Sequence, residues 1–441
     1  MENRSFDSYF GKLNEYRAKF GLGPDVNGLP DDCSSSNSDW TVACSAMNKA
    51  PDASGAPTTP TYAFHLKTSC IENTSADWTA SHWAFNAEAP SSGTPLLDGF
   101  AISAASAAYA DCPTTGTCTS TNNYPDLRGI RAMGFYTSAD LEFHYWLATQ
   151  FATSDNWFAP APAKTEPNRY YMVGATSGGH AYQLTSGQPT IHGKTIFDLL
   201  TAAGVSWKIY EQNNALSANA FSGFSPPSGS IVQDDGNASQ FIAAAKSGTL
   251  PAVTYIENPD ADEHPGSEDI ESGVALTKAM VDAVMNGPLW KDSVFIITFD
   301  EGGGLYDHVA PPTSVPSPDG IQPIDICTSA GASGCATAAL THANPPAGPP
   351  DPAGDFTRYG YRVPLMVISP FAKKGYVSHS LTDYTAWMKF VETRFNLAHL
   401  TARDAAAIDM TEFFDFQNPS WLTPPGNEPG IASLSCHSGL P

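Results

Sequence analysis

The sequence predicts an α/β fold, in which a mostly parallel sheet lies between layers of helices. Short continuous apolar runs, such as SVFIITF at 293–299 and VPLMVIS at 363–369, are typical of strands buried on both faces. Segments with the spacing of amphipathic helices alternate with these runs along most of the chain. Such alternation is typical of strand–helix–strand units, whose parallel strands are covered by helices.

Local signals give the order of the elements. Residues 138–151 have helical spacing, with Ser138 in the position of an N-cap. Residues 169–175 (RYYMVGA) predict a strand that ends at Ser177-Gly178-Gly179. Further along, we expect helices at 195–203, 238–246, 272–286 and 383–397, and strands at 205–210, 252–257, 293–299 and 363–369.

Two long segments interrupt this alternation. Residues 22–125 and 310–357 are rich in Ser, Thr, Pro and Gly and contain cysteines. Because the α/β pattern resumes after each of them, we expect a single domain over 1–441 with two loop-rich insertions over one face.

The charge excludes some classes of partner. The chain has 22 Lys and Arg against 45 Asp and Glu, a formal net charge of −23. No basic stripe is available for a phosphate backbone, so nucleic acid is not an expected partner. No stretch approaches the ~18 apolar residues of a spanning helix, so stable membrane insertion is not expected either.

Eight cysteines form an even set without zinc-ligand spacing. Cys112/Cys118 and Cys327/Cys335 bracket short loops, which favours disulfides in an oxidising compartment over scattered free thiols. The spacing does not determine which cysteines pair.

Carboxylates and an amide at two places suggest a metal site. Asp300-Glu301 directly follows the strand at 293–299 and precedes three glycines, and two adjacent carboxylates there favour a bound cation. A solvated loop with two ordinary acids is the alternative. Glu2-Asn3 offers hard oxygen ligands, although a frayed polar terminus has the same composition.

Hydroxyl and imidazole side chains suggest the remaining chemistry. Thr176 or Ser177, in a glycine-rich turn, could act as a nucleophile, or the turn could be ordinary. His264, between acids and Pro265, could donate a proton to a leaving group, or lie in a surface turn. His82 and His308 are further candidates.

Together these clusters describe a phosphoryl-transfer site. The chain has no GxxxxGK[ST] motif for nucleotide-driven chemistry and no GxSxG motif of an ordinary α/β-hydrolase esterase.

The same residues lie in segments that resemble the bacterial and fungal phosphoesterase family, which contains phosphatidylcholine-preferring phospholipases C and acid phosphatases. The segments follow the family's order over nearly the whole chain: ENRSFDSYFG (2–11), DWTASHWAFN (77–86), MGFYTSADLEFHYWLATQFATSDNWF (133–158), EPNRYYMVGATSGG (166–179), DEHPG (262–266), FIITFDEGGGLYDHVAPP (295–312), RYGYRVPLMVISPFAKKGYVSHS (358–380) and FFDF (413–416).

The resemblance implies a core like that of alkaline phosphatase and assigns roles to these residues. It implies a divalent metal ion held by Glu2, Asn3, Asp300 and Glu301 and shared with the nucleophile, for which Thr176 is favoured and Ser177 stays open. His264 would be the leaving-group acid and His82 would line the phosphate site. His308 would be either catalytic or structural support.

Function follows from the same resemblance. We expect a metal-dependent phosphoesterase of phospholipase C type that forms a phospho-threonine, with a broad-specificity acid phosphatase as the alternative and a non-catalytic binding module as a remote one. The substrate would be a phospholipid or a small soluble ester. Trp83, Tyr145, Trp146 and Tyr306 are available for an aromatic choline site.

The chain also departs from the family pattern. Family members have an apolar core strand directly before the segment that matches ENRSFD, and a secretion signal before that strand. We therefore expect a secreted or periplasmic protein whose first core strand is missing before residue 1. The larger phospholipases C continue into C-terminal β domains, whereas this chain ends soon after 413–416.

Overall fold

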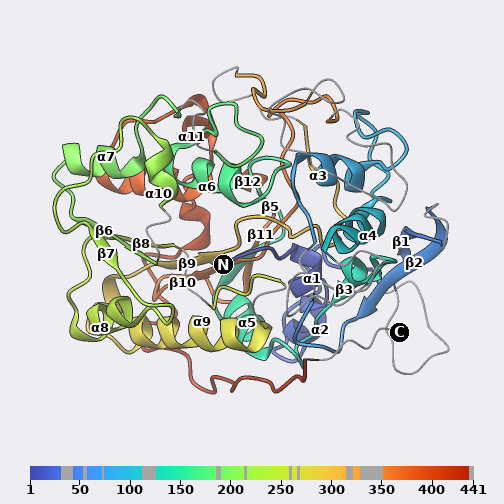
Figure 1. The fold of residues 1–441 in the computed structure, drawn as a ribbon. Coiled ribbons are helices and arrows are strands. Elements are labelled where there is room, and N and C mark those ends of the chain that lie inside the picture. The colour runs from blue at the N-terminus through green and yellow to red at the C-terminus, as the bar shows by residue number, and fades with distance from the viewer. Residues whose placement is uncertain are drawn as a thin grey trace.

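The computed structural model describes the chain in segments: residues 1–30, 43–52, 57–71, 74–111, 126–184, 190–212, 216–257, 261–265, 269–313, 321–327 and 351–436. Within them the fold is α/β, as the sequence predicts. Two sheets in the middle of the molecule lie between two layers of helices (Figure 1).

The first central sheet has the strand order β11-β4-β10-β9, formed by Tyr376–Ser378, Ala152–Ser154, Leu365–Ile368 and Phe295–Thr298. β4 and β11 are parallel, whereas β10 is antiparallel to both of its neighbours. The second has the order β7-β6-β8, formed by Ile231–Gln233, Trp207–Glu211 and Val253–Glu257, and is parallel throughout. The central strands are therefore parallel except for β10.

Helices cover both faces of these sheets. On one side lie α6, α7, α10 and α11, formed by Thr165–Gly174, Ile196–Ala202, Thr385–Phe395 and Ala402–Ala406 (Figure 1). On the other lie α5, α8 and α9, formed by Glu142–Gln150, Ser239–Ser247 and Ile270–Met285. The buried side chains of both layers belong to one continuous apolar core.

The remaining elements pack beside this sandwich. They are α1 (Phe6–Phe10), α2 (Leu13–Ala18), β1 (Ala43–Pro51), β2 (Pro57–His65), α3 (Trp78–Phe85), α4 (Phe100–Asp111), β3 (Gly134–Phe135), β5 (Trp157–Phe158), β12 (Thr382–Asp383) and the short 3-10 helices Ile130–Met133, Ser217–Ala220, Trp290–Asp292 and Thr411–Phe413. The segment 22–125, expected to be loop-rich, thus contains a hairpin and two helices.

One predicted element is wrong. Residues 169–175 were expected to be a strand, but 165–174 form α6. Pro167 lies in the first turn, where it needs no backbone donor and where its fixed φ suits a helix. The aromatic and apolar residues that suggested a strand fill the buried face of the helix instead. The helix predicted at 138–151 begins later, at Glu142.

The first residues of the chain lie between the two central sheets. Asp300 N donates to Met1 O at 3.1 Å, and Glu2 N donates to Asp262 O at 2.9 Å, so this segment connects the ends of β9 and β8. Among the described strands, β9 pairs only with β10 and β8 only with β6. A core strand preceding residue 1 stays a prediction.

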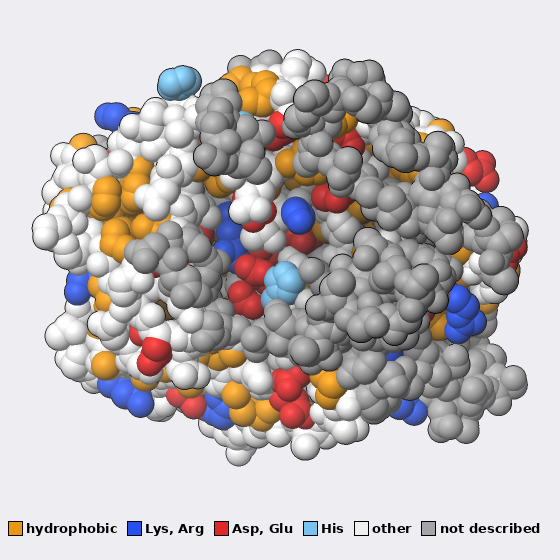
Figure 2. Space-filling model, in the orientation of Figure 1, with side chains coloured by type: hydrophobic (Ala, Val, Ile, Leu, Met, Phe, Trp, Pro, Cys, Tyr) orange, Lys and Arg blue, Asp and Glu red, His pale blue; other side chains and the backbone are white. Residues whose placement is uncertain are grey.

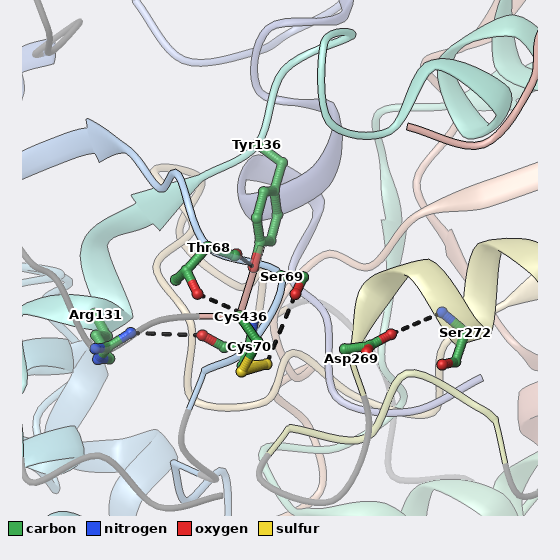
Figure 3. Close-up of a disulfide and its surroundings, with 8 residues drawn as sticks. All are labelled: Thr68, Ser69, Cys70, Arg131, Tyr136, Asp269, Ser272 and Cys436. Carbon is green, nitrogen blue, oxygen red and sulfur yellow. Dashed lines mark hydrogen bonds between the residues drawn. A yellow bond between two sulfur atoms is a disulfide. The ribbon is translucent and has the colours of Figure 1, made fainter. Parts of the chain in front are cut away.

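A disulfide joins Cys70 to Cys436, which are separated by 366 positions (Figure 3). The hydroxyl of Tyr136 donates to Thr68 O at 2.9 Å, and Ser69 N donates to Ser435 O at 3.4 Å. The C-terminal segment is thereby attached near β2. Of the loops expected to be closed by disulfides, 112–118 and Cys335 lie outside the described residues.

We predict that Cys436→Ser lowers the free energy of unfolding by about 2–5 kcal/mol, because the bond restricts the unfolded chain across most of its length. Urea denaturation of both proteins under non-reducing conditions measures the difference. The double variant Cys70→Ser/Cys436→Ser should lose little more than the single variant. Equal midpoints for the wild type and Cys436→Ser would contradict the prediction.

Candidate active site

The backbone of the first residues brings two of the predicted acidic segments together. Asn3 N donates to Asp300 Oδ1 at 3.1 Å, and Arg4 N donates to Glu301 O at 3.1 Å. Asn3 has a left-handed φ of 61°, and a side chain on Gly303 would collide with the Asn3 carbonyl. The glycines after Glu301 therefore permit the close approach of these two segments.

The side chains at this junction are acidic and buried. Asp300 is 1% exposed and Glu301 is 3% exposed. Burial raises the pKa of Asp300, and the charge of Glu2 raises it further. Burial and then Asp300 raise the pKa of Glu301 well above its usual range. The nearby Asp262 has its pKa raised to about 8 by burial and by Glu2.

Arg169 on α6 supplies positive charge to this cluster. Its Nε lies 3.2 Å from Asp300 Oδ2, and its Nη2 pairs with Glu2 Oε1. The sequence reasoning missed Arg169, although an arginine among apolar helix residues in a chain poor in basic residues was an available signal.

The donor set suits a divalent cation. Asn3 Oδ1 is buried and has no hydrogen-bond partner, and buried polar atoms normally have one. The charge of Glu2 acts on both Asp300 and Glu301, and carboxylate and amide oxygens are ligands for hard divalent ions. The backbone of Asn3 and Arg4 thus joins the segment of Glu2 and Asn3 to Asp300 and Glu301, and their role as metal ligands stays a prediction.

His264 belongs to the same place. Its Nε2 lies 3.5 Å from Glu2 Oε2, and its ring is partly exposed. Glu263, next to His264, anchors the segment 261–265. It is fully buried, has a φ of 73°, and accepts a hydrogen bond from Tyr9 Oη at 2.5 Å. His144 Nε2 lies 3.2 Å from its other oxygen. The sequence reasoning missed Glu263 as an anchor.

Figure 2 shows a hollow in the middle of one face, where Asp and Glu side chains, a His and Lys or Arg side chains gather. In the same orientation, Figure 1 places the N-terminus in this region. The acidic junction therefore lies where the surface is hollowed.

Thr176 and Ser177 follow the C-terminal end of α6 instead of a strand. Thr176 Oγ1 accepts from Gly178 N at 2.9 Å, within a turn in which Gly178 and Gly179 have positive φ. Thr176 is 8% exposed, whereas Ser177 is fully buried. A nucleophile must reach its substrate, so the exposure favours Thr176. Thr176 lies seven residues after Arg169, just beyond the end of α6.

The other two histidines have different surroundings. His82 Nδ1 lies 2.7 Å from Trp78 O, and its ring lines a pocket together with Gly354 and Arg358. His308 Nδ1 lies 2.7 Å from Asp7 Oδ2. Because Asp7 also pairs with buried Arg362, the contacts of His308 favour structural support.

Burial lowers the pKa of His82 to about 4, against an ordinary value of 6.5. The unfolded chain therefore binds this proton at higher pH than the folded chain, and the free energy of unfolding should fall as the pH falls from 6.5 to 4. We predict that His82→Gln reduces this fall by about 3 kcal/mol. Urea denaturation at several pH values measures it, with the exposed His192→Gln as control. Identical pH profiles for the wild type and His82→Gln would contradict the prediction.

The chain is similar in sequence to proteins named phospholipase C. The chain is 34% identical over 291 residues to non-specific phospholipase C1 of Arabidopsis thaliana, covering 61% of this chain and 49% of that protein. It is 31% identical over 316 residues to phospholipase C B of Mycobacterium tuberculosis, covering 65% and 57%. The chain thus spans about half the length of the curated relatives it matches.

A solved structure of a protein in the alkaline phosphatase superfamily from Vibrio parahaemolyticus matches with a TM-score of 0.35 and 11% identity, covering 62% of this chain and 65% of that one. A model of the Phosphoesterase family matches residues 1–398, which include all of the candidate site residues. The chain therefore belongs to the Phosphoesterase family.

Proposed function

We propose that the protein is a metal-dependent phosphoric ester hydrolase of phospholipase C type. The observation that carries the proposal is the junction of residues 2–3 with Asp300-Glu301, which combines two buried carboxylates with a buried amide oxygen that has no hydrogen-bond partner. Membership of the Phosphoesterase family and the phospholipase C names of the relatives support the type of ester.

The chemistry divides among a few residues. When bound, a divalent cation lowers the pKa of a hydroxyl and offsets negative charge on phosphorus oxygens. Thr176 Oγ1 loses its proton to solvent and attacks phosphorus, so that a bond from Oγ1 to phosphorus forms while the bond to the leaving oxygen breaks. His264 gives its proton to that leaving oxygen. Water then attacks the phosphorus of this adduct and gives a proton to Thr176 Oγ1, which restores the hydroxyl and releases the phosphorylated headgroup of a diester or the phosphate of a monoester.

Fewer aromatic residues are available for a choline site than the sequence suggested. Tyr145 and Trp146 are at most 2% exposed and belong to the main core, so the proposal of an aromatic choline site through them is wrong. Trp83 is partly exposed and remains a candidate. A broad-specificity acid phosphatase remains the second candidate function, because a phosphate monoester needs no such site.

The cellular location follows from the same features. The Cys70–Cys436 disulfide supports a secreted or periplasmic protein, because such bonds persist in oxidising compartments. No described helix is long and apolar enough to cross a bilayer.

Hydrolysis of a phosphorylcholine diester and of a phosphate monoester, measured from pH 4 to 8 with and without chelator, tests the function. We predict that Asp300→Asn lowers turnover by about 100-fold or more, because it removes one ligand charge. Asp269→Asn is the matched control, since Asn can also cap α9. Normal turnover and normal metal content in Asp300→Asn would exclude a ligand role for Asp300. If the wild-type protein itself has neither bound metal nor activity, the binding-module alternative is supported.

The nucleophile is tested separately. We predict that Thr176→Ala abolishes the acid-trapped phospho-enzyme while the bound metal is largely retained, and that Ser177→Ala leaves the adduct in place. Mass spectrometry after rapid acid quenching measures the amount of phospho-enzyme. Loss of the adduct only in Ser177→Ala would move the nucleophile to Ser177.

A further inference from the structure

A second group of potential ligands lies at the junction of α10 and α11, away from the residues discussed so far. Glu392 is on α10, Asp404 is on α11, and His399 lies in the connection between them. One potential ligand atom from each of the three lies within 4.8 Å of the other two. The cluster therefore has the dimensions of a site for a single ion.

The carboxylates of this cluster are buried, and one oxygen of Glu392 has no donor. Glu392 is 1% exposed; its Oε2 lies 2.7 Å from His399 Nδ1, whereas its Oε1 is buried without a hydrogen-bond partner. Asp404 is fully buried and accepts from Leu400 N at 2.7 Å and Thr401 N at 2.8 Å. Burial, and then a hydrogen bond between the Glu392 and Asp404 carboxyls, raise the pKa of Glu392 to about 9. An oxygen so placed needs a proton or a cation.

We propose that Glu392, His399 and Asp404 bind a divalent transition-metal ion, with Zn²⁺ as the favoured ion. Two carboxylates and an imidazole are typical ligands of zinc, whereas calcium and magnesium prefer oxygen ligands alone. The His399 side chain is 44% exposed, which leaves a route for the ion and room for a water ligand.

One basic side chain opposes the ion. Lys389 Nζ lies 3.4 Å from His399 Nε2 and donates to Ala405 O at 3.1 Å. It therefore contacts the ring nitrogen that faces away from Glu392. Its charge weakens cation binding without filling the position between the carboxylates.

The site is connected to the proposed nucleophile. Thr401 Oγ1 lies 3.2 Å from Asp404 Oδ1 and 3.2 Å from Ala175 O, and Ala175 directly precedes Thr176. A bound ion would fix Asp404 and, through Thr401, support the turn that holds Thr176. This connection rests on the proposed function, whereas the ion site itself does not.

The test compares zinc binding by the full chain and by Glu392→Gln. The Gln amide can donate to Asp404 as a protonated Glu392 would, so this variant should fold but lose the ion. After removal of metal and dialysis against ZnCl₂, elemental analysis should find one zinc fewer per chain than in the wild type. Lys389→Gln should bind zinc at least threefold more tightly by calorimetry, and His399→Ala about tenfold more weakly.

The same measurements in the Asp300→Asn background separate this site from the proposed catalytic metal. A zinc lost in Glu392→Gln in both backgrounds supports the α10–α11 site whatever happens at Asp300. Equal zinc content and equal affinity in the wild type, Glu392→Gln and Lys389→Gln would overturn the proposal and would mean that the two carboxylates share a proton only.

Discussion

The ion pairs that Arg169 makes with Glu2 and Asp300 are the interaction on which the candidate site depends. They join the N-terminal segment, the end of β9 and helix α6, which come from three distant parts of the chain. Without a positive charge between them, the carboxylates of Glu2 and Asp300 would repel each other. In a chain with twice as many acidic as basic residues, the placement of each cation has structural consequences.

Most of the few arginines are placed inside the molecule. Six of the nine are buried: Arg4, Arg17, Arg131, Arg169, Arg362 and Arg403. Arg362 pairs with Asp7 and Asp307, and Arg403 pairs with Asp383. Three of the six buried arginines, Arg169, Arg362 and Arg403, thus pair with buried acids. Removal of one partner of such a pair is far more damaging than loss of a surface pair.

The sequence predicted the α/β class and most of the regular elements, because 293–299 and 363–369 contain continuous apolar runs and the long helices have a clear period. It failed at α6, where local composition resembles that of a strand and only tertiary packing decides. The very short strands β4, β5, β11 and β12 were also beyond prediction, since two or three residues carry no period.

The candidate site was predicted in part for similar reasons. Glu2, Asn3, Asp300, Glu301 and His264 could be chosen because each stands in a short polar motif. Arg169 and Glu263 could not, because their roles arise from contacts with residues 131 to 254 positions away. The surroundings of Thr176 could not be predicted either, since the turn was assigned to the wrong kind of element.

The Cys70–Cys436 bond has a consequence for how damage to the chain would be observed. Every peptide bond between residues 71 and 435 lies inside the covalent ring that this disulfide closes. A protease that cuts once anywhere in that range produces two fragments that stay joined. Such a nicked protein would keep its mass, apart from one added water, until a reductant separates the fragments. Intact mass alone is therefore a poor measure of chain integrity for this protein.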